Sequence, residues 1–325
     1  MATEFEEFHA ELRSVAGDLL AKDRSVEWPV LVDAGWTGLE VPDEFGGAGA
    51  TFAETAVICE EIGRAASANS YLGSAVLAVG ILKALQPNAI RDELLCGIAS
   101  GTVRAAAAVG SLDFVADAEG ADRLLVVTHD SDGTPVVVAS AGLAVTPRPV
   151  VDETRRLASV STDGIETTGA LRFDGDPEAA VRRLHDRAAV AVACDSLGLS
   201  EAMLSATVSY AKVRHQFGRP IGSFQAVKHA CADMSVKISV ARQLVVAAVD
   251  AVAQDRPDVD VAAAMAKSYA TGTAVDIVGK AMQLHGGIGY TWESGIHVYL
   301  KRAVLNRSLF GSPAEHRSQL TKRYV

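Results

Sequence analysis

The sequence has few cysteines and lacks a cluster of basic residues. Each of these shortages argues against a class of protein. The four cysteines, Cys59, Cys96, Cys194 and Cys231, stand far apart, with no CxxC pair and no nearby histidine cluster. This spacing argues against both a disulfide scaffold and a zinc site. The formal charge of −10 argues against nucleic-acid binding, because neutralising phosphates requires clustered lysine and arginine. We therefore expect no metal and no nucleic-acid partner.

The chain also lacks the long apolar runs that secretion and membrane insertion require. Residues 1–11 are acidic and contain no apolar core, which argues against a secretory signal. The longest apolar run, 244–253, includes Asp250 and falls well short of a bilayer span. We expect no membrane insertion, and we expect the reducing cytoplasm as the compartment.

What the sequence has in abundance is small apolar side chains. Hydrophobic residues make up 49% of the 325 residues while aromatic residues make up only 6%, so alanine and valine supply most of the apolar content. A chain of this length and composition buries a substantial core and is not disordered. Small side chains allow the close packing found in helical bundles and at subunit interfaces, and we expect an oligomer.

The hydrophobic pattern changes twice along the chain. Helical patterns fill residues 4–97. Two short runs rich in β-branched residues, 124–128 and 135–139, then flank a polar turn at 129–133 and predict a β-hairpin. Further short runs, 157–161 and 170–173, extend this region into a small β-domain.

Helical patterns return after Pro177. Apolar residues in alternating steps of four and three predict a long bundle helix with a buried seam at Val227, Cys231, Met234, Ile238, Ala241, Val245, Ala248 and Val252. Pro257 ends this helix, and another is predicted over 259–284, stopped by Gly286 and Gly287. The predicted fold is mainly α with a small β-domain, divided into residues 1–101, 102–176 and 177–325.

Several motifs resemble those of the acyl-CoA dehydrogenase family, and the resemblance covers nearly the whole chain. The stretch 210–229 matches the family element R-x-Q-F-G-x-P-I-x-x-F-Q, and 283–289 matches its Q-x-x-G-G turn. Residues 35–64 and 152–156 are similar to patterns of the family's first domain and of the end of its β-domain. The resemblance implies an N-terminal helical domain, a shortened β-domain and a C-terminal four-helix bundle.

The resemblance also implies FAD, bound across a subunit interface. In the family these motifs contact the pyrophosphate and adenosine, which assigns cofactor binding to Arg214, Gln216, Phe217, Gln225, Gln283, Gly286 and Gly287. The chemistry agrees with this assignment, because an arginine offers a planar fork of donors to phosphate oxygens. Glycines let backbone N–H groups approach a phosphate without an intervening Cβ.

One family residue is missing. In the family a glutamate removes the α-proton of an acyl-CoA thioester, and counting from the glycine turn places Phe310 at its position. The second site that some members use falls on Ala188. The nearby carboxylates, Asp186, Asp195 and Glu201, are expected to be solvated or interface charges. No catalytic residue is assigned from the sequence.

These departures favour one interpretation and leave two alternatives. The β-domain segments that flank the flavin ring in the family are shortened, with 114–118 as the nearest match. We expect a base-lacking, FAD-anchoring subunit that pairs with a catalytic subunit to oxidise bulky, such as steroid-derived, acyl-CoA thioesters, with electron-transfer flavoprotein as a possible acceptor. The alternatives are a homo-oligomeric dehydrogenase using Asp186 or Glu201 as base, and a non-catalytic scaffold.

Overall fold

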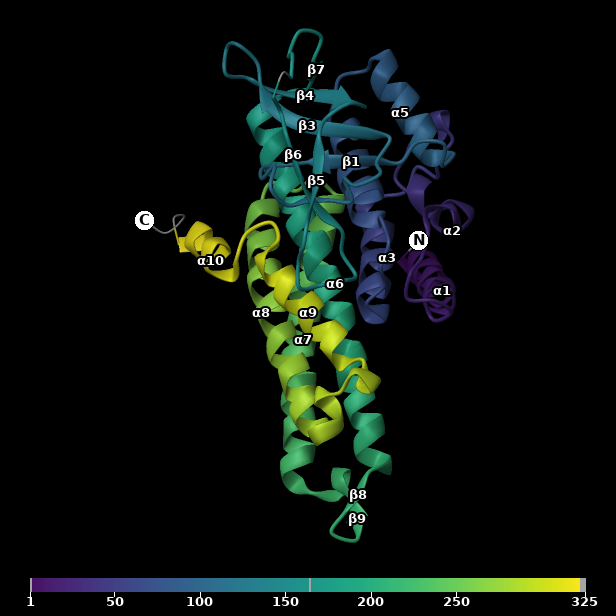
Figure 1. The fold of residues 1–325 in the computed structure, drawn as a ribbon, viewed down its shortest axis with the longest axis vertical. Helices are drawn as coiled ribbons and strands as arrows, with labels where there is room; N and C mark the ends of the chain where they lie inside the picture. Colours follow the sequence, from purple (N-terminus) through teal and green to yellow (C-terminus); the bar gives the residue numbers. More distant parts are fainter. Residues whose placement is uncertain (1, 164, 322–325) are drawn as a thin grey trace.

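The computed structural model describes residues 2–163 and 165–321 and places a small β-region at one end of a long bundle of helices (Figure 1). The N-terminal helices lie beside the half of the bundle nearer the β-region. They are α1 (Ala2–Leu20), α2 (Trp28–Asp33), α3 (Phe52–Ala65), the π-helix η3 (Leu72–Ala78), α4 (Val79–Lys83) and α5 (Ala89–Ala99), with 3-10 turns η1 (Trp36–Gly38) and η2 (Asp43–Phe45). The predicted fold class, mainly α with a small β-domain, is confirmed.

The β-region consists of two small sheets. One has the strand order β1-β3-β4-β7 and the other β2-β6-β5. The strands are β1 (Ala105–Ala108), β2 (Val115–Ala116), β3 (Arg123–His129), β4 (Pro135–Ser140), β5 (Val145–Arg148), β6 (Leu157–Val160) and β7 (Leu171–Arg172). The predicted hairpin is confirmed, because β3 and β4 pair antiparallel with Leu125 opposite Ala139 and Thr128 opposite Val136.

The bundle is built from α6 (Pro177–Val213), α7 (Gln225–Ala253), α8 (Val259–His285) and α9 (Ile296–Ser308), with the short α10 (Pro313–Thr321) packed against α8. The predicted seam is correct in the middle of α7, where Met234, Ile238, Ala241, Val245 and Ala248 are buried. Its outer members, Val227, Cys231 and Val252, are only partly buried, because they lie nearer the ends of the helix.

Helix α8 runs one residue beyond the predicted range and stops at the glycines. Gly286 adopts a φ of 65°, a left-handed value that suits glycine and ends the helix.

Helix α6 is long and apolar enough to cross a membrane by length and composition alone. However, 78% of its most apolar 18-residue segment is buried inside the fold, as in the core helix of a globular protein.

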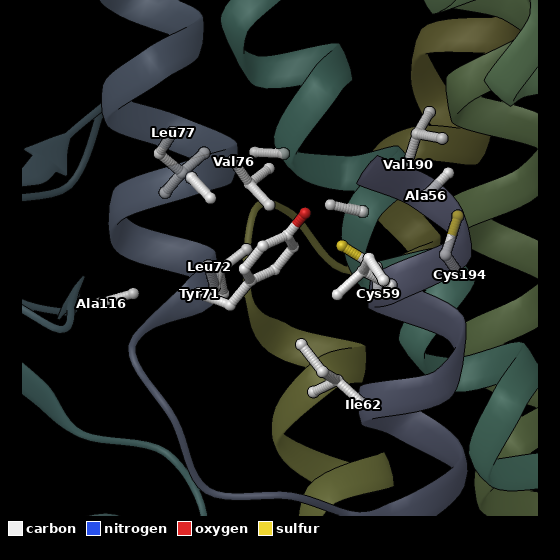
Figure 2. Packing of buried hydrophobic residues seen from close by; sticks show 14 of the residues in the cluster. Ala56, Cys59, Ile62, Tyr71, Leu72, Val76, Leu77, Ala116, Val190 and Cys194 are labelled. Atoms are coloured by element: carbon white, nitrogen blue, oxygen red, sulfur yellow. The ribbon is translucent and has the colours of Figure 1, made fainter. Parts of the chain in front are cut away.

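The core joins the N-terminal helices to the bundle through small and medium side chains (Figure 2). Cys59 and Ile62 of α3 lie close to Cys194 of α6 and to Tyr71, which is 1% exposed. All four cysteine thiols are free. Burial raises the pKa of Cys59 to about 12, so this thiol serves as an apolar packing group rather than a nucleophile.

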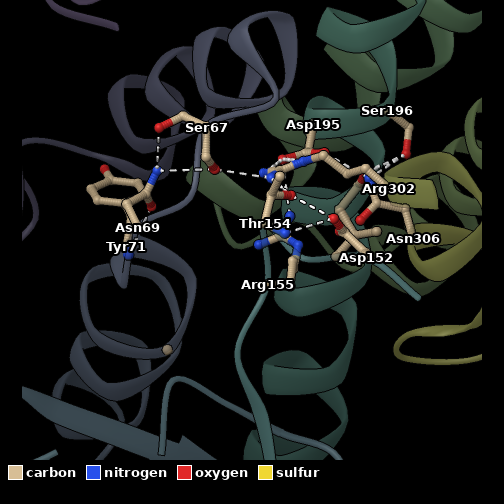
Figure 3. Close-up of polar contacts among 12 residues, drawn as sticks. Ser67, Asn69, Tyr71, Asp152, Thr154, Arg155, Asp195, Ser196, Arg302 and Asn306 are labelled. Atoms are coloured by element: carbon tan, nitrogen blue, oxygen red, sulfur yellow. Dashed lines mark hydrogen bonds and ion pairs between the residues drawn. The ribbon is translucent and has the colours of Figure 1, made fainter. Parts of the chain in front are cut away.

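A buried polar network links all three parts of the chain (Figure 3). Arg302 of α9 is fully buried and donates to both carboxylate oxygens of Asp195 on α6, to the hydroxyl of Thr154 between β5 and β6, and to the carbonyl of Ser67 after α3. Arg155 also pairs with Asp195, at 2.9 Å. Burial opposes ionisation, but the Arg302 and Arg155 charges hold the pKa of Asp195 below its ordinary value.

The chain divides naturally where helices give way to strands and back. Helix α5 ends at Ala99 before β1 begins at Ala105, and β7 ends at Arg172 before α6 begins at Pro177. We propose residues 1–101, 102–176 and 177–325 as the three domains.

Candidate functional site

The residues that the sequence assigned to FAD gather at the end of the bundle far from the β-region. Helix α6 ends at Val213, and a hairpin of β8 (His215–Gln216) and β9 (Arg219–Pro220) leads through η4 (Ile221–Ser223) into α7. Figure 1 shows this hairpin at the tip of the bundle. The hydroxyl of Tyr210 on α6 donates to the carbonyl of His285, and the two rings stack with centroids 4.4 Å apart. This contact places the end of α8 beside the end of α6.

The hairpin presents its polar groups to solvent. Arg214 is exposed, and its guanidinium has no hydrogen-bond or ion-pair partner within residues 2–163 and 165–321. The side chain of Gln216 donates to the neighbouring His215 carbonyl, at 2.9 Å. Phe217 is 90% exposed and has a φ of 53°, and its ring meets Phe224 edge-on. An unpaired arginine beside an exposed phenyl ring leaves both groups available to a ligand or to a second chain.

The second half of the predicted FAD set is equally open. Gln225 is the first residue of α7 and is exposed. Gln283 is exposed and accepts a hydrogen bond from Lys280 at 2.9 Å. A Cβ built on Gly286 or Gly287 would meet no atom within 4 Å, so the backbone here faces open space. At this end of the bundle the described residues therefore present these groups outward.

A separate cavity of about 1040 Å³ lies where the β-region meets α6, α8 and the C-terminal turn. Its walls include Val109 and Phe114 from the β-region, His185 and Asp186 from α6, and Phe310 and His316 from the C-terminal segment. The volume is at the upper end of what small-molecule sites have, and such junctions are where cofactors and substrates usually bind. Phe114 belongs to the segment that the sequence matched to the flavin-flanking stretch.

The three candidate carboxylates have very different surroundings. Asp195 is 2% exposed within the Arg302 network, so its interpretation as a solvated or interface charge was wrong. Glu201 is held by Arg64 and Arg242; burial opposes ionisation, but these hydrogen bonds lower its pKa. Only Asp186 lines the cavity, and there burial and the Asp260 charge raise its pKa to about 6, against the opposing charge of Arg182.

Neither of the two positions that the sequence resemblance assigns to the family's base carries a carboxylate. Phe310 lines the cavity, whereas Ala188 is fully buried in the core. The sequence analysis missed His185, whose pKa burial lowers, and Lys267, which lies buried behind the cavity wall. The sequence does contain a signal for Lys267, because it is the single charge within residues 261–275 of α8.

Comparison with known proteins agrees with this architecture. The family model "Acyl-CoA dehydrogenase, N-terminal domain" matches residues 1–102, and "Acyl-CoA dehydrogenase, C-terminal domain" matches residues 179–325. The chain is 36% identical to the acyl-CoA dehydrogenase IpdE2 of Mycolicibacterium smegmatis, over 90% of this chain and 86% of that protein.

Two solved structures extend the likeness. One is the Tcur3481-Tcur3483 steroid ACAD G363A variant, with a TM-score of 0.83, 26% identity, and coverage of 98% of this chain and 97% of the other. The other is the ChsE4-ChsE5 complex from Mycobacterium tuberculosis, with a TM-score of 0.82, 22% identity, and coverage of 97% and 96%. At 22% identity this second likeness concerns the fold alone.

The fold and cavity define a class: a mainly α protein with a small β-region and a large cavity at their junction. The chain belongs to the acyl-CoA dehydrogenase family. That family consists of FAD-dependent oxidoreductases acting on CH–CH bonds, and the resemblance seen in the sequence is confirmed.

Proposed function

We propose that this chain is the base-lacking, FAD-anchoring subunit of a heteromeric α2β2 acyl-CoA dehydrogenase that introduces an α,β double bond into bulky CoA thioesters. The observation that carries the proposal is Phe310, which lines the cavity at the position of the family's glutamate. A phenyl ring has no atom that accepts a proton, so the base that acts on the substrate comes from the other subunit.

The outward-facing FAD residues fit a cofactor shared between subunits. We assign the cofactor contacts to Arg214, Gln216, Phe217, Gln225, Gln283, Gly286 and Gly287. Within the described residues the Arg214 guanidinium has no partner, which suits a bidentate contact to a pyrophosphate. Gly286 and Gly287 leave room for a phosphate close to the backbone. When bound, FAD supplies the hydride acceptor; this chain's residues hold and orient it.

The relatives support the substrate class and the partner. The matched relative IpdE2 is an acyl-CoA dehydrogenase. The matched structure at 26% identity is a steroid enzyme that carries the names of two proteins, Tcur3481 and Tcur3483. We assign this chain a steroid-derived or similarly bulky acyl-CoA thioester, a catalytic acyl-CoA dehydrogenase as its partner, and electron-transfer flavoprotein as the acceptor.

A second candidate function follows from Asp186. It is the one carboxylate of the three that faces the cavity, and a pKa of about 6 suits a base acting near neutral pH. A homo-oligomer using Asp186 would turn over acyl-CoA without a partner. Asp186→Ala would then abolish bleaching of the flavin by acyl-CoA, whereas the same change leaves bleaching intact if the base belongs to the other subunit. Glu201 is no longer a candidate for the base, because its carboxylate forms ion pairs with Arg64 and Arg242.

The isolated chain should contain little flavin and show no dehydrogenase activity. Coexpression with its catalytic partner should yield a yellow complex with about one FAD for each pair of different chains, and with activity on its acyl-CoA substrate. Absorbance at the flavin bands, divided by protein concentration, measures the content. Steady turnover by the pure chain would contradict the proposal.

Arg214→Ala should weaken FAD binding in the assembled complex by about 10- to 100-fold, because a charge-assisted hydrogen bond contributes about 1.5–3 kcal/mol. Fluorescence of released flavin during dilution measures the affinity. The matched control is Arg256→Ala, which removes an exposed arginine paired with Asp258 after the other end of α7. If both variants retain the wild-type flavin content, Arg214 has no cofactor role; this would also favour the reading of the chain as a non-catalytic scaffold.

A further inference from the structure

The turn that carries Phe310 has an unusual backbone. Phe310 and Gly311 have consecutive positive φ values, 53° and 93°, so the chain reverses sharply between α9 and α10. Glycine is required at the second position, because a Cβ there would lie 2.8 Å from the ring nitrogen Nε2 of His316. Phe310 itself has the strain of a left-handed non-glycine residue, and such strain persists only where the surroundings hold it.

Lys267 of α8 stabilises this turn through hydrogen bonds to its backbone. Its side chain is fully buried, and its ammonium group donates to the carbonyls of Gly311 at 2.7 Å, Asn306 at 3.1 Å and Arg307 at 3.5 Å. Two of these carbonyls belong to the last turn of α9, where they have no partner within the helix. The Lys267 side chain therefore connects the end of α9 to the residue that follows Phe310.

Residues of helix α10 also stabilise the turn through hydrogen bonds. The ring of His316 is hydrogen-bonded through Nε2 to the carbonyl of Phe310, at 2.9 Å. Ser312 and Glu315 form a reciprocal cap, in which the N–H of Ser312 donates to the Glu315 carboxylate at 2.6 Å and the N–H of Glu315 donates to the Ser312 hydroxyl at 3.3 Å. None of these contacts, nor those of Lys267, uses the side chain of Phe310.

We propose that this turn still presents residue 310 to the cavity as a base-carrying turn would, with Lys267 and His316 as positioning residues, so that the turn lacks the carboxylate and not the backbone geometry. A glutamate at 310 would then take the α-proton of a thioester bound in the cavity. The C–H bond breaks, its electron pair remains on the acyl group as an enolate, and the proton goes to the carboxylate. This inference rests on the proposed absence of a base.

Proton exchange tests the idea without flavin or partner. Phenylacetyl-CoA has acidic α-protons and no β-hydrogen, so it cannot be oxidised to an enoyl thioester. The isolated 325-residue chain is incubated with phenylacetyl-CoA in D2O, and mass spectrometry follows deuterium entering the α-carbon. Phe310→Glu should exchange at least about 100-fold faster than wild type, the usual lower range for a positioned general base. Phe310→Gln is the matched control, because it has a similar shape and no base.

The outcomes separate the two proposals. A Phe310→Glu chain that exchanges no faster than Phe310→Gln, or that no longer binds the thioester, overturns this inference and leaves the proposed function untouched. Rapid exchange by the wild-type chain that Asp186→Asn removes would instead overturn the base-lacking role, because the chain would then carry its own proton acceptor.

The positioning roles need a readout that a loss of stability does not mimic. In the Phe310→Glu background, His316→Leu should slow exchange by about 10-fold or more and shift the midpoint of its pH profile, while His316→Gln, which retains a side-chain N–H donor, should restore most of the rate. Lys267→Met should shift the same midpoint. The titratable and charged groups that share the cavity are Arg182, His185, Asp186, Asp260, Glu315 and His316, and Lys267 contacts the turn from behind. Unchanged pH midpoints in both variants would show that neither residue positions the carboxylate.

Discussion

Arg302→Met should lower the free energy of unfolding by about 3–5 kcal/mol. The substitution removes the buried guanidinium that binds Asp195, Thr154 and Ser67, and so leaves a carboxylate without its main counter-charge. Breaking a buried ion pair by removing one partner costs this much because the remaining charge stays desolvated. Urea unfolding of the assembled protein, followed by circular dichroism, measures the change.

Two comparisons identify the cause. Arg148→Met breaks an exposed pair with Asp113 and should change stability by less than about 1 kcal/mol. Arg302→Met and Asp195→Asn remove the same ion pair, so the double variant should lose less stability than the sum of the two single changes. A loss equal to that sum would mean that lost packing, and not the ion pair, causes the destabilisation.

The Arg302 effect should also depend on pH with a definite sign. The folded-state pKa of Asp195 lies below its ordinary value of 3.8, so the ion pair stabilises the fold fully above that value and is lost as the pH falls through the folded-state pKa. The difference between wild type and Arg302→Met should therefore be full at neutral pH and shrink only in acid below about pH 3.8.

Gly198→Ala should destabilise the protein by about 3 kcal/mol or more. Helices α3 and α6 cross at two glycines, where a Cβ on Gly198 would clash with the backbone of Glu60, and one on Gly63 would clash with the backbone of Asp195. Both Cβ positions would lie closer than 3.0 Å to main-chain atoms, which cannot rotate away as a side chain could. Added volume in a closely packed interior forces the two helices apart.

The matched control is Gly279→Ala in α8, where a Cβ would meet no atom within 4 Å. This change removes a helix-destabilising glycine and should raise stability by about 0.5–1 kcal/mol. In parallel thermal melts, Gly198→Ala should lower the melting temperature and Gly279→Ala should raise it. Equal small effects would show that α3 and α6 can separate at their crossing without cost.

The main features of the fold could be predicted from the sequence because they depend on local patterns. The β3–β4 hairpin follows from two β-branched runs around a polar turn, and the end of α8 follows from Gly286. The middle of the α7 seam follows from the spacing of its apolar residues. Each of these signals lies within a few residues of the structure it predicts, so no distant contact is needed to read it.

The surroundings of the charged residues could not be predicted in the same way. Asp195 and Asp186 lie nine residues apart on the same helix, yet one is buried in an ion-pair network and the other faces a cavity. The difference comes from Arg302 and Phe310, more than a hundred residues further along the chain. The hydrogen bond from Lys267 to the carbonyl of Gly311 likewise joins residues that no sequence pattern relates.

The amino-acid sequence alone determined the element order, the family resemblance and the presence of phenylalanine where that resemblance places a glutamate, because these are properties of residue type and spacing. Only the tertiary structure decided which carboxylate faces the cavity, which ones are neutralised by arginines, and that the turn around Phe310 is held by groups other than its own side chain. Burial and pairing depend on which distant segments meet, and folding alone brings them together.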